Sequence, residues 1–270
     1  MAVFIVARRA RTPKWLAAAR ESGRTGSDWL SRALGRAGAV PPEEIESAIA
    51  SGRVRVDGRV ATKPFTPVTE SSKVTVDGAP VSMERVTRVL MLHKPAGVLA
   101  EGSGRDTRPT VLDVLQPLLP ETLRGFTWLA VGRLDVDTTG LLLFTNDERF
   151  VAHATSPETH LPKRYVASVS EKATEEQLEP LRRGVTLDDG PARPATARLR
   201  APGVVELTLT EGRNHQVKRM LAAVGLPVLK LHREAVGSLV CDVDEGAMRE
   251  VSSEELASRL SFTLSGARSA

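Results

Sequence analysis

The chain has 270 residues, 41% of them hydrophobic and 26% charged, with a formal net charge of +4. Its length allows two modest domains, and its single cysteine, Cys241, excludes an intramolecular disulfide framework. No apolar run approaches the roughly 18 residues of a membrane span, and a lone cysteine suits a reducing compartment, so we expect a cytoplasmic protein without a membrane partner.

The chain opens with a short apolar run followed by four basic residues. A secretory signal has the reverse order, so we expect residues 1–24 to form a basic, flexible tail instead. The basic residues are Arg8, Arg9, Arg11 and Lys14. The positive charge of the chain is compatible with a polyanionic partner but does not require one.

Residues 25–84 show helical periodicity and then alternation with a period of two. Two short helices are predicted from apolar residues at helical spacing, which are Trp29, Leu30, Ala33, Leu34, Ile45, Ala48 and Ile49. Strands are predicted at Val54–Val56 and at "VTVDG", each followed by an Asp-Gly turn, and both belong to one small sheet. The unit has about sixty residues, near the lower limit for independent folding.

Residues 85–257 are assigned to a second domain. Strands are predicted at "RVLMLHKPAGV", Leu141–Thr145, Tyr165–Val169 and Val204–Thr210. A helix follows in "NHQVKRMLAAVGLP", where Asn214 is the expected N-cap and Gly225 with Pro227 marks the end. Strands outnumber helices, so we predict a mixed, mainly antiparallel α+β domain. The chain is expected to fray after about Glu255, with residues 258–270 as a C-terminal tail.

The spacing of the metal-binding residue types does not suggest a metal. The five histidines form no H-x-x-x-H pattern and the single cysteine can form no C-x-x-C, so neither a metal nor a cofactor is predicted. A basic cluster has two open interpretations, a solvated helix face or a contact with RNA phosphates. The cluster comprises Arg213, Lys218, Arg219, Lys230 and Arg233.

Two aspartates in "VGRLDVDTTGLLLFTND" have three interpretations. Asp135 and Asp137 could flank a sugar, as paired carboxylates do in glycosidases. Asp137, before Thr-Thr-Gly, is more typical of a turn residue that bonds its local backbone. Asp135 could be an ordinary loop carboxylate paired with Arg133. Spacing alone favours this last interpretation.

Longer motifs identify a family resemblance. "GRLDVDTTGLLLFTND" resembles the signature of the bacterial rRNA pseudouridine synthases that carry an S4-like N-terminal domain. The segments "LMLHKPAGV", "RPTVLDVL", "KRYVASV" and "EGRNHQVKRMLAAVGLPVLKLHREAVG" resemble other elements of that family in the same order. The resemblance covers residues 27–255 and implies an S4-like helix-helix-hairpin domain before a pseudouridine synthase domain.

The resemblance assigns roles to individual residues. Asp135 would be the catalytic aspartate, Tyr165 the ring that packs against the target base, and Lys218 the cation paired with Asp135. Arg133 would help to hold the uridine out of its helix. Further RNA contacts are expected at Arg213, His215, Gln216, Arg219, Arg53, Arg55, Arg59 and Lys63. The reaction requires an ionised carboxylate but no redox step, metal or cofactor.

"HQVKRMLAAVG" followed by "LHRE" is most similar to the small-subunit branch of the family. This implies a monomeric enzyme acting on 16S rRNA in a partly assembled small subunit. Three alternatives are a synthase for 23S rRNA, a non-catalytic RNA-binding assembly factor and a metal-free nucleoside hydrolase. Two features depart from the family: the S4-like segment has "GSDWL" and "PPEEIE" in place of its usual basic residues, and His93 replaces a common asparagine.

Overall fold

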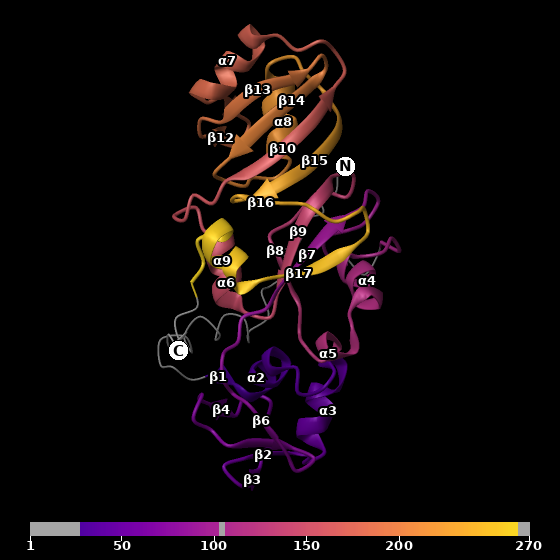
Figure 1. The fold of residues 1–270 in the computed structure, drawn as a ribbon, viewed down its shortest axis with the longest axis vertical. Helices are drawn as coiled ribbons and strands as arrows, with labels where there is room; N and C mark the ends of the chain where they lie inside the picture. The colour runs from indigo at the N-terminus through magenta and orange to yellow at the C-terminus, as the bar shows by residue number, and fades with distance from the viewer. Residues whose placement is uncertain (1–27, 103–105, 264–270) are drawn as a thin grey trace, which may run out of the picture. The chain divides into compact units, whose positions relative to one another are not determined.

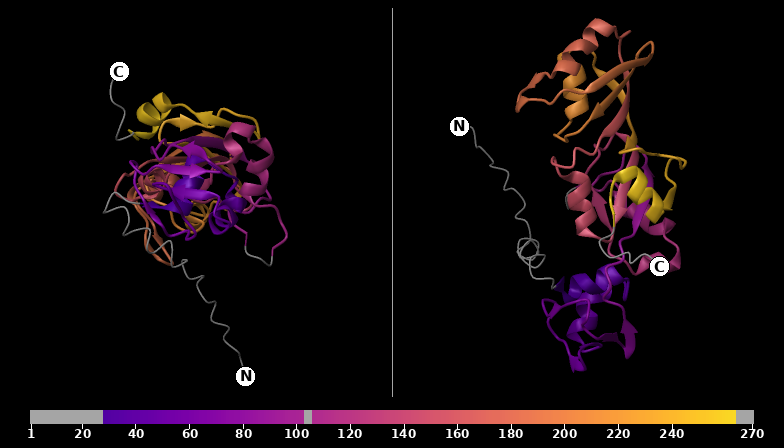
Figure 2. Two further views of the ribbon diagram at one scale, coloured as in Figure 1. Left: turned by 90° about the horizontal axis from the view of Figure 1, so that it is seen from below. Right: turned by 60° about the vertical axis from the view of Figure 1, so that its left-hand side comes forward.

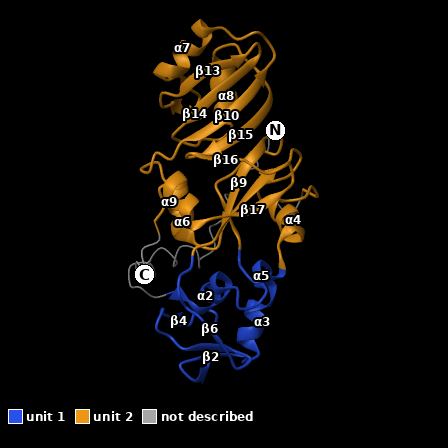
Figure 3. Cartoon of the chain, in the orientation of Figure 1, with its two compact units in different colours: residues 1–86, 121–127 blue, residues 87–120, 128–270 orange. Residues whose placement is uncertain are grey.

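The structure, a computed structural model, describes residues 28–102 and 106–263, which form two compact units (Figures 1 and 3). The first unit runs to Val86 and includes Glu121–Thr127; the second comprises Thr87–Pro120 and the chain from Trp128 onward. Residues 121–127 thus group with the first unit, although the sequence analysis placed them in the second. The basic tail expected at residues 1–24 lies outside the described residues.

The first unit contains the two expected helices and a small sheet, coloured blue in Figure 3. Antiparallel pairing joins β2 to β5, which confirms that the two predicted strands share one sheet. The helices are α2 (Leu30–Ala37), α3 (Ile45–Ala50), a 3-10 turn at Pro42–Glu44 and α5 (Glu121–Arg124). The strands are β1 (Asp28–Trp29), β2 (Val54–Val56), β3 (Arg59–Val60), β4 (Pro67–Val68), β5 (Val74–Val76) and β6 (Ala79–Val81).

Two Asp-Gly turns build the sheet of the first unit. Asp57 and Gly58 have φ of 48° and 80°, and Asp77 and Gly78 have φ of 51° and 83°. Positive φ at both central residues is the geometry that closes a two-residue hairpin, and Asp followed by Gly tolerates it best. The turns therefore fix the registers of β2 with β3 and of β5 with β6.

The second unit is built on one nine-stranded sheet. Seven of the strands follow the order β13-β14-β10-β15-β9-β7-β17, and the other two, β16 and β8, pair with β15 and β9. Within this sheet the pairing of β15 with β9 is parallel and the other pairings are antiparallel, which confirms the mixed, mainly antiparallel α+β fold. The strands are β7 (Val89–Lys94), β8 (Leu129–Val131), β9 (Thr139–Thr145), β10 (Lys163–Val169), β13 (Thr196–Ala201), β14 (Val204–Leu209), β15 (Val228–Val236), β16 (Leu239–Val240) and β17 (Met248–Val251).

Helices pack on the two halves of this sheet (Figure 2), and each half has its own hydrophobic core. One core packs apolar residues of β10, β14 and β15 against α7 (Glu175–Arg183) and α8 (Gln216–Ala223). The other packs β7 and β9 against α6 (Glu148–Thr155) and α9 (Ser253–Leu260). The shorter elements are α4 (Val111–Leu115), a 3-10 turn at Gln116–Leu118, β11 (Thr186–Leu187) and β12 (Gly190–Pro191). No helix among the described residues is long and apolar enough to cross a membrane.

Two sequence expectations about helix ends are wrong. The N-cap position of α8 is held by His215 in the left-handed conformation, with φ of 50°, and not by Asn214, and the side chain of His215 makes no capping hydrogen bond. The chain does not fray directly after Glu255, because α9 continues to Leu260. A capping box between Ser252 and Glu255 starts this helix, and Leu256 and Leu260 are buried in the core. Only residues 264–270 at the C-terminal end lie outside the described part.

The halves of the sheet meet where β15 runs parallel to β9. The register pairs there are His232 with Thr139 and Arg233 with Gly140. A Cβ atom at Gly140 would lie 2.3 Å from the carbonyl oxygen of Arg233, so glycine is required for this close approach. The loop that precedes β9 carries Asp135, and this junction therefore positions the candidate site.

Candidate active site

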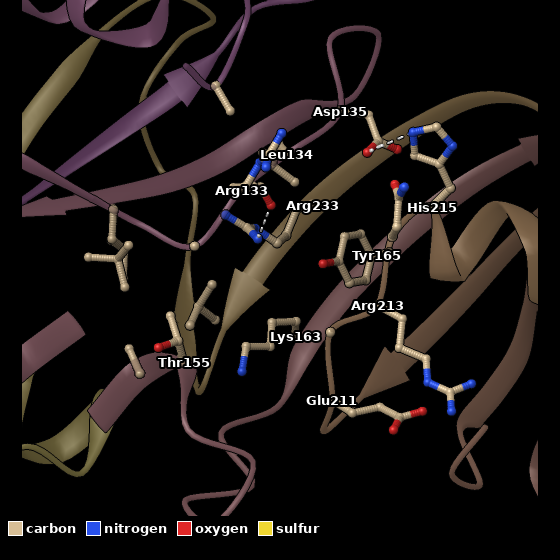
Figure 4. Close-up of a pocket in the computed structure, with 18 of the residues that line it drawn as sticks. Arg133, Leu134, Asp135, Thr155, Lys163, Tyr165, Glu211, Arg213, His215 and Arg233 are labelled. Atoms are coloured by element: carbon tan, nitrogen blue, oxygen red, sulfur yellow. Dashed lines mark hydrogen bonds and ion pairs between the residues drawn. The ribbon is translucent and has the colours of Figure 1, made fainter. Parts of the chain in front are cut away.

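A cavity of about 870 Å³ opens at the junction of the two halves of the second unit (Figure 4). Its walls come from the loop between β8 and β9, from β10, from the loop after β14 and from α8. This volume is in the range of pockets that enclose small ligands or single nucleotides. Six of the site residues that the family resemblance implied line it, namely Arg133, Asp135, Tyr165, Arg213, His215 and Lys218, together with Asp137 and Arg233.

Lys218 contacts both aspartates of the loop. Its Nζ lies 3.1 Å from Asp135 Oδ2 and 2.6 Å from Asp137 Oδ1. The side chain of Asp135 is 24% exposed, whereas that of Asp137 is 67% exposed. The sequence analysis had Asp137 bond its local backbone, and a backbone hydrogen bond at Asp137 is present. Its side chain also accepts a hydrogen bond from Lys218, so one cation contacts both aspartates.

The charges of this cluster support one another. The hydrogen bond from Lys218 lowers the pKa of Asp137. Burial lowers the pKa of Lys218, but hydrogen bonds to Asp137 and Asp135 outweigh it and raise that pKa above its ordinary value. At neutral pH the cluster therefore holds a protonated amine between carboxylates. His215 is a further neighbour of Asp135, with its Nε2 3.5 Å from Asp135 Oδ1.

Arg133 does not pair with Asp135 in the described structure, contrary to the simplest interpretation of the sequence. Its side chain is exposed at the pocket, and its carbonyl oxygen accepts a hydrogen bond of 3.5 Å from Arg233. Figure 4 shows this bond as a dashed line between Arg133 and Arg233. The guanidinium of Arg133 is therefore available to a ligand.

Tyr165 reaches the pocket from β10. Its backbone pairs with Leu207 of β14 and Arg233 of β15, and its half-buried ring packs against the core beneath α8. A bulge between Arg164 and Tyr165 changes the register at this point. The ring lines the same cavity as Asp135 (Figure 4), so a planar base in the pocket could contact both.

Lys94 is a functional residue that the sequence reasoning missed. It is fully buried at the end of β7, and its Nζ donates hydrogen bonds to the carbonyl oxygens of Pro95, Val136 and Thr138, at 2.9, 3.3 and 3.0 Å. Burial lowers its pKa to about 8. The lysine thus ties the loop that carries Asp135 to β7. Its position in "HKPAG", where a charged residue ends an apolar strand, was the available signal.

The basic cluster is largely occupied by partners within the protein. Arg213 donates to Asp189 and to the carbonyl oxygen of Gly190, at 3.1 and 2.9 Å, and Arg219 pairs with Asp188 and Asp189. These aspartates form the turn between β11 and β12, far from the cluster in sequence. The sequence around the basic cluster therefore gave no indication of these carboxylate partners.

Gln216 and Arg233 are buried rather than presented to a ligand from the surface. Gln216 is 3% exposed and its side chain bridges Glu211 Oε1, at 2.5 Å, and the backbone N–H of Arg213, at 2.9 Å. This bridge shapes the loop that enters α8. Gln216 was expected to contact RNA, but its side chain is engaged in these two hydrogen bonds within the protein.

The basic residues expected on the hairpin belong to the first unit. Arg53 is paired with Asp77 and Glu44. Arg55, Arg59 and Lys63 are exposed, and Arg55 also donates to the carbonyl oxygen of Gly58 at 3.2 Å.

His93, the departure from the family pattern, lies outside the pocket lining. Its Nδ1 lies 2.9 Å from the carbonyl oxygen of Val243, and its ring meets the ring of His232 edge to face with centroids 5.2 Å apart. His232 in turn bonds the hydroxyl of Thr139 at 2.9 Å. Among the described residues no cluster of three His, Cys, Asp or Glu side chains could hold a metal ion.

The fold and pocket define an enzyme of the pseudouridine synthase class. A crystal structure described as a pseudouridylate synthase is similar with a TM-score of 0.58 and 28% identity, covering 84% of this chain and 97% of that one. Residues 88–223 match the RNA pseudouridylate synthase family model, and the chain belongs to this family.

Two groups of curated relatives differ in their named targets. A ribosomal large subunit pseudouridine synthase B from Salmonella typhi is 40% identical over 222 residues, covering 79% of this chain and 75% of the relative. The ribosomal small subunit pseudouridine synthase A of Escherichia coli (strain K12) is 36% identical over 234 residues, covering 85% and 97%. The identities confirm the family resemblance but do not confirm the small-subunit branch.

Proposed function

We propose that this enzyme isomerises a uridine of ribosomal RNA to pseudouridine, with Asp135 as the catalytic carboxylate. The observation that carries the proposal is the contact of 3.1 Å between Lys218 and the partly buried Asp135, in a pocket that Tyr165 also lines. The contact places a cation directly beside the proposed catalytic carboxylate, within the same pocket. A protein that only bound RNA would have no need of this arrangement.

The reaction breaks the bond between C1′ and N1, turns the uracil, and forms a bond between C1′ and C5. Asp135 either bonds to the nucleotide or removes its 2′ proton, and both routes require the ionised form. The uridine must first leave the RNA stack, at a cost of a few kcal/mol that pocket contacts recover. The exposed Arg133 is suited to hold the vacated place, and Tyr165 to pack against the base.

We further propose that the first unit is an S4-like module that binds folded RNA. Arg55, Arg59 and Lys63 are exposed on it, and cations of this kind contact phosphates. Among the other residues expected to contact RNA, His215 is accessible, with 57% of its side chain exposed. Arg213, Gln216 and Arg219 would act mainly by shaping the pocket wall. We expect a cytoplasmic monomer that meets rRNA during ribosome assembly.

Large-subunit rRNA is the substrate that the relatives support best, because the 40% identical proteins are named for it. Small-subunit rRNA, the target expected from the C-terminal motif, is the second candidate. The small-subunit relative is matched over 97% of its length, against 75% for the large-subunit one.

The test is to map pseudouridines on both rRNAs from cells with and without the gene. We expect one site to disappear on deletion, to return with the wild-type gene, and to remain absent when Asp135→Asn is supplied. A lost site in 16S rRNA would select the second candidate. Unchanged maps of both rRNAs would contradict the proposed function.

A further inference from the structure

Lys163 lines the pocket with an ammonium group that has no acceptor among the described residues. It precedes Tyr165 by two positions on β10, so both side chains leave the same face of the strand, as Figure 4 shows. Burial lowers the pKa of Lys163 to about 8, and the positive charge of Arg233 acts in the same direction. An unpaired ammonium in such surroundings is costly unless a ligand supplies its partner.

Arg233 adds a second cation that lacks a carboxylate. It is 5% exposed, and its Nε and Nη1 donate to the carbonyl oxygens of Leu141 and Arg133, at 2.7 and 3.5 Å. In the part of the chain that the structure describes, neither Arg233 nor Lys163 forms an ion pair. The pocket therefore has two electrostatic parts: Lys218 lies between two aspartates, whereas Lys163 and Arg233 form no ion pair, although Glu101 and Glu211 also line the cavity.

Two groups of the substrate could carry the complementary negative charge, a phosphate or the uracil itself. When the bond between C1′ and N1 breaks, its electron pair goes to the uracil, which becomes an anion delocalised over N1, O2 and O4. Asp135 compensates at the sugar by bonding C1′ or by taking the 2′ proton. The uracil electrons then form the bond to C1′ through C5, which releases Asp135 from C1′ on the first route, while on the second route C2′ regains its proton. C5 loses its proton and N1 gains one, so the isomer is neutral.

The surroundings of Lys163 favour the uracil. The pocket there is also lined by Val131, Ala154 and Val236, which suit a flat base better than a hydrated phosphate. We propose that Lys163, with Arg233 behind it, contacts the flipped uracil and stabilises the negative charge that the base carries during the reaction. The inference rests on the proposed function and adds a catalytic residue to it.

The test compares Lys163→Met, which keeps the length but removes the charge, with Lys163→Arg, which keeps the charge. Lys172→Met, an exposed lysine beyond the end of β10, is the matched control. The substrate is rRNA from cells that lack the gene, at saturating enzyme in single-turnover conditions. Loss of a preorganised charge at a developing anion slows catalysis by about 10² to 10³-fold. We expect this loss for Lys163→Met, with an RNA Kd within a few-fold of wild type and partial recovery in Lys163→Arg.

The pH profile gives a second readout. The wild-type rate should fall above about pH 8 as Lys163 and Lys94, whose pKa values are both lowered to about 8, lose their protons. Lys163→Arg should make this fall shallower, because arginine stays protonated while Lys94 still titrates. If Lys163 had only a structural role, its replacement by arginine would not change how the rate falls at high pH. Equal impairment of Lys163→Met and Lys163→Arg, with a lowered melting temperature, would therefore overturn the proposal.

A phosphate contact would give a different result. Lys163→Met would then weaken RNA binding and reduce the slope of log Kd against log salt by about one unit, with an unchanged rate at saturation, and the proposal would be wrong. Asp135→Asn is measured in parallel. If the wild-type enzyme forms no pseudouridine, the proposed function fails; if it is active and Lys163→Met is equally fast, only the inference fails.

Discussion

At the scale of single residues, the site depends on how Lys218 divides its contacts between two carboxylates. Asp135 is the more buried, and burial makes its charge more effective toward a bound ligand. Asp137 is mostly exposed, where an ion pair contributes only about 0–1 kcal/mol. The two aspartates therefore share a cation without sharing a role.

Asp135→Asn should abolish pseudouridine formation and leave the RNA Kd within a few-fold of wild type. The amide keeps the shape of the side chain but removes the charge that the chemistry needs. Asp137→Asn is the matched control, since it also removes a partner of Lys218. We expect it to keep activity within about tenfold, because the lost ion pair is exposed. Single-turnover conversion and filter binding measure both quantities. Substantial turnover by Asp135→Asn would disprove the assignment.

At the scale of elements, the loop that presents Asp135 is held at two points. Lys94 at the end of β7 binds the loop carbonyl oxygens of Val136 and Thr138, and Thr138 donates its N–H to the carbonyl oxygen of Asp135 at 3.1 Å. At the other end Gly140 lies against the backbone of Arg233 where β9 meets β15. The loop therefore has little freedom, as a preorganised site requires.

Lys94→Met should lower the free energy of unfolding by about 1–3 kcal/mol, because three buried carbonyl oxygens lose their donor. It should also slow the single-turnover rate. The folded pKa of Lys94, about 8, lies below the ordinary lysine value of 10.5, so the unfolded chain binds more protons between these pH values. Stability therefore rises with pH in this window.

The pKa of Lys163 is lowered in the same direction. Lys94→Met should therefore make the rise of stability with pH shallower without removing it. The pH dependence of the free energy of unfolding is measured by chemical denaturation of wild type and variant, in steps of ~1 pH unit between pH 7 and 10. Identical pH slopes would show that Lys94 is not a shifted, buried ammonium.

Gly140→Ala should destabilise the second unit by about 3 kcal/mol or more, from left-handed strain and overpacking together. The new Cβ would lie 2.3 Å from the carbonyl oxygen of Arg233, at a residue with φ of 106°. Gly58→Ala is the control, because its φ of 80° carries strain but nothing lies within 4 Å. Thermal unfolding compares the two variants. Similar losses would mean that the junction can relax around an added methyl group.

At the scale of the whole molecule, each unit is expected to contribute separately to RNA recognition. The second unit holds the pocket, while the first presents exposed cations without the usual basic residues of its helices. Binding through phosphates depends on salt, whereas the isomerisation step within the bound complex does not depend on those contacts. The two contributions can therefore be separated by experiment.

Replacing Arg55, Arg59 and Lys63 together by glutamine should weaken RNA binding and reduce the slope of log Kd against log salt by about two units. The single-turnover rate at saturating enzyme should stay near wild type, because none of the three lines the pocket. Binding measured across a salt series provides both numbers. An unchanged slope would exclude these side chains from the RNA interface.

Local patterns were sufficient to predict the elements near the site. Apolar periodicity predicted α2, α3 and β14, and the Asp-Gly turns predicted the hairpins, because each feature depends on residues a few positions apart. The capping box of α9 was also readable, from Ser252 and Glu255, but was overlooked among the Ser and Arg residues of the C-terminal segment.

The sequence alone also determined the family, since its motifs are long and occur in order, and it singled out Asp135, Tyr165 and Lys218. The resemblance also implied the pairing of Lys218 with Asp135, but only the tertiary structure decided the other partners. The contact of Lys218 with Asp137, the pairing of Arg219 with Asp188, and the unpaired charge of Lys163 depend on contacts between residues far apart in the chain. Periodicity within a segment carries no information on such contacts, because they arise only when distant segments pack together.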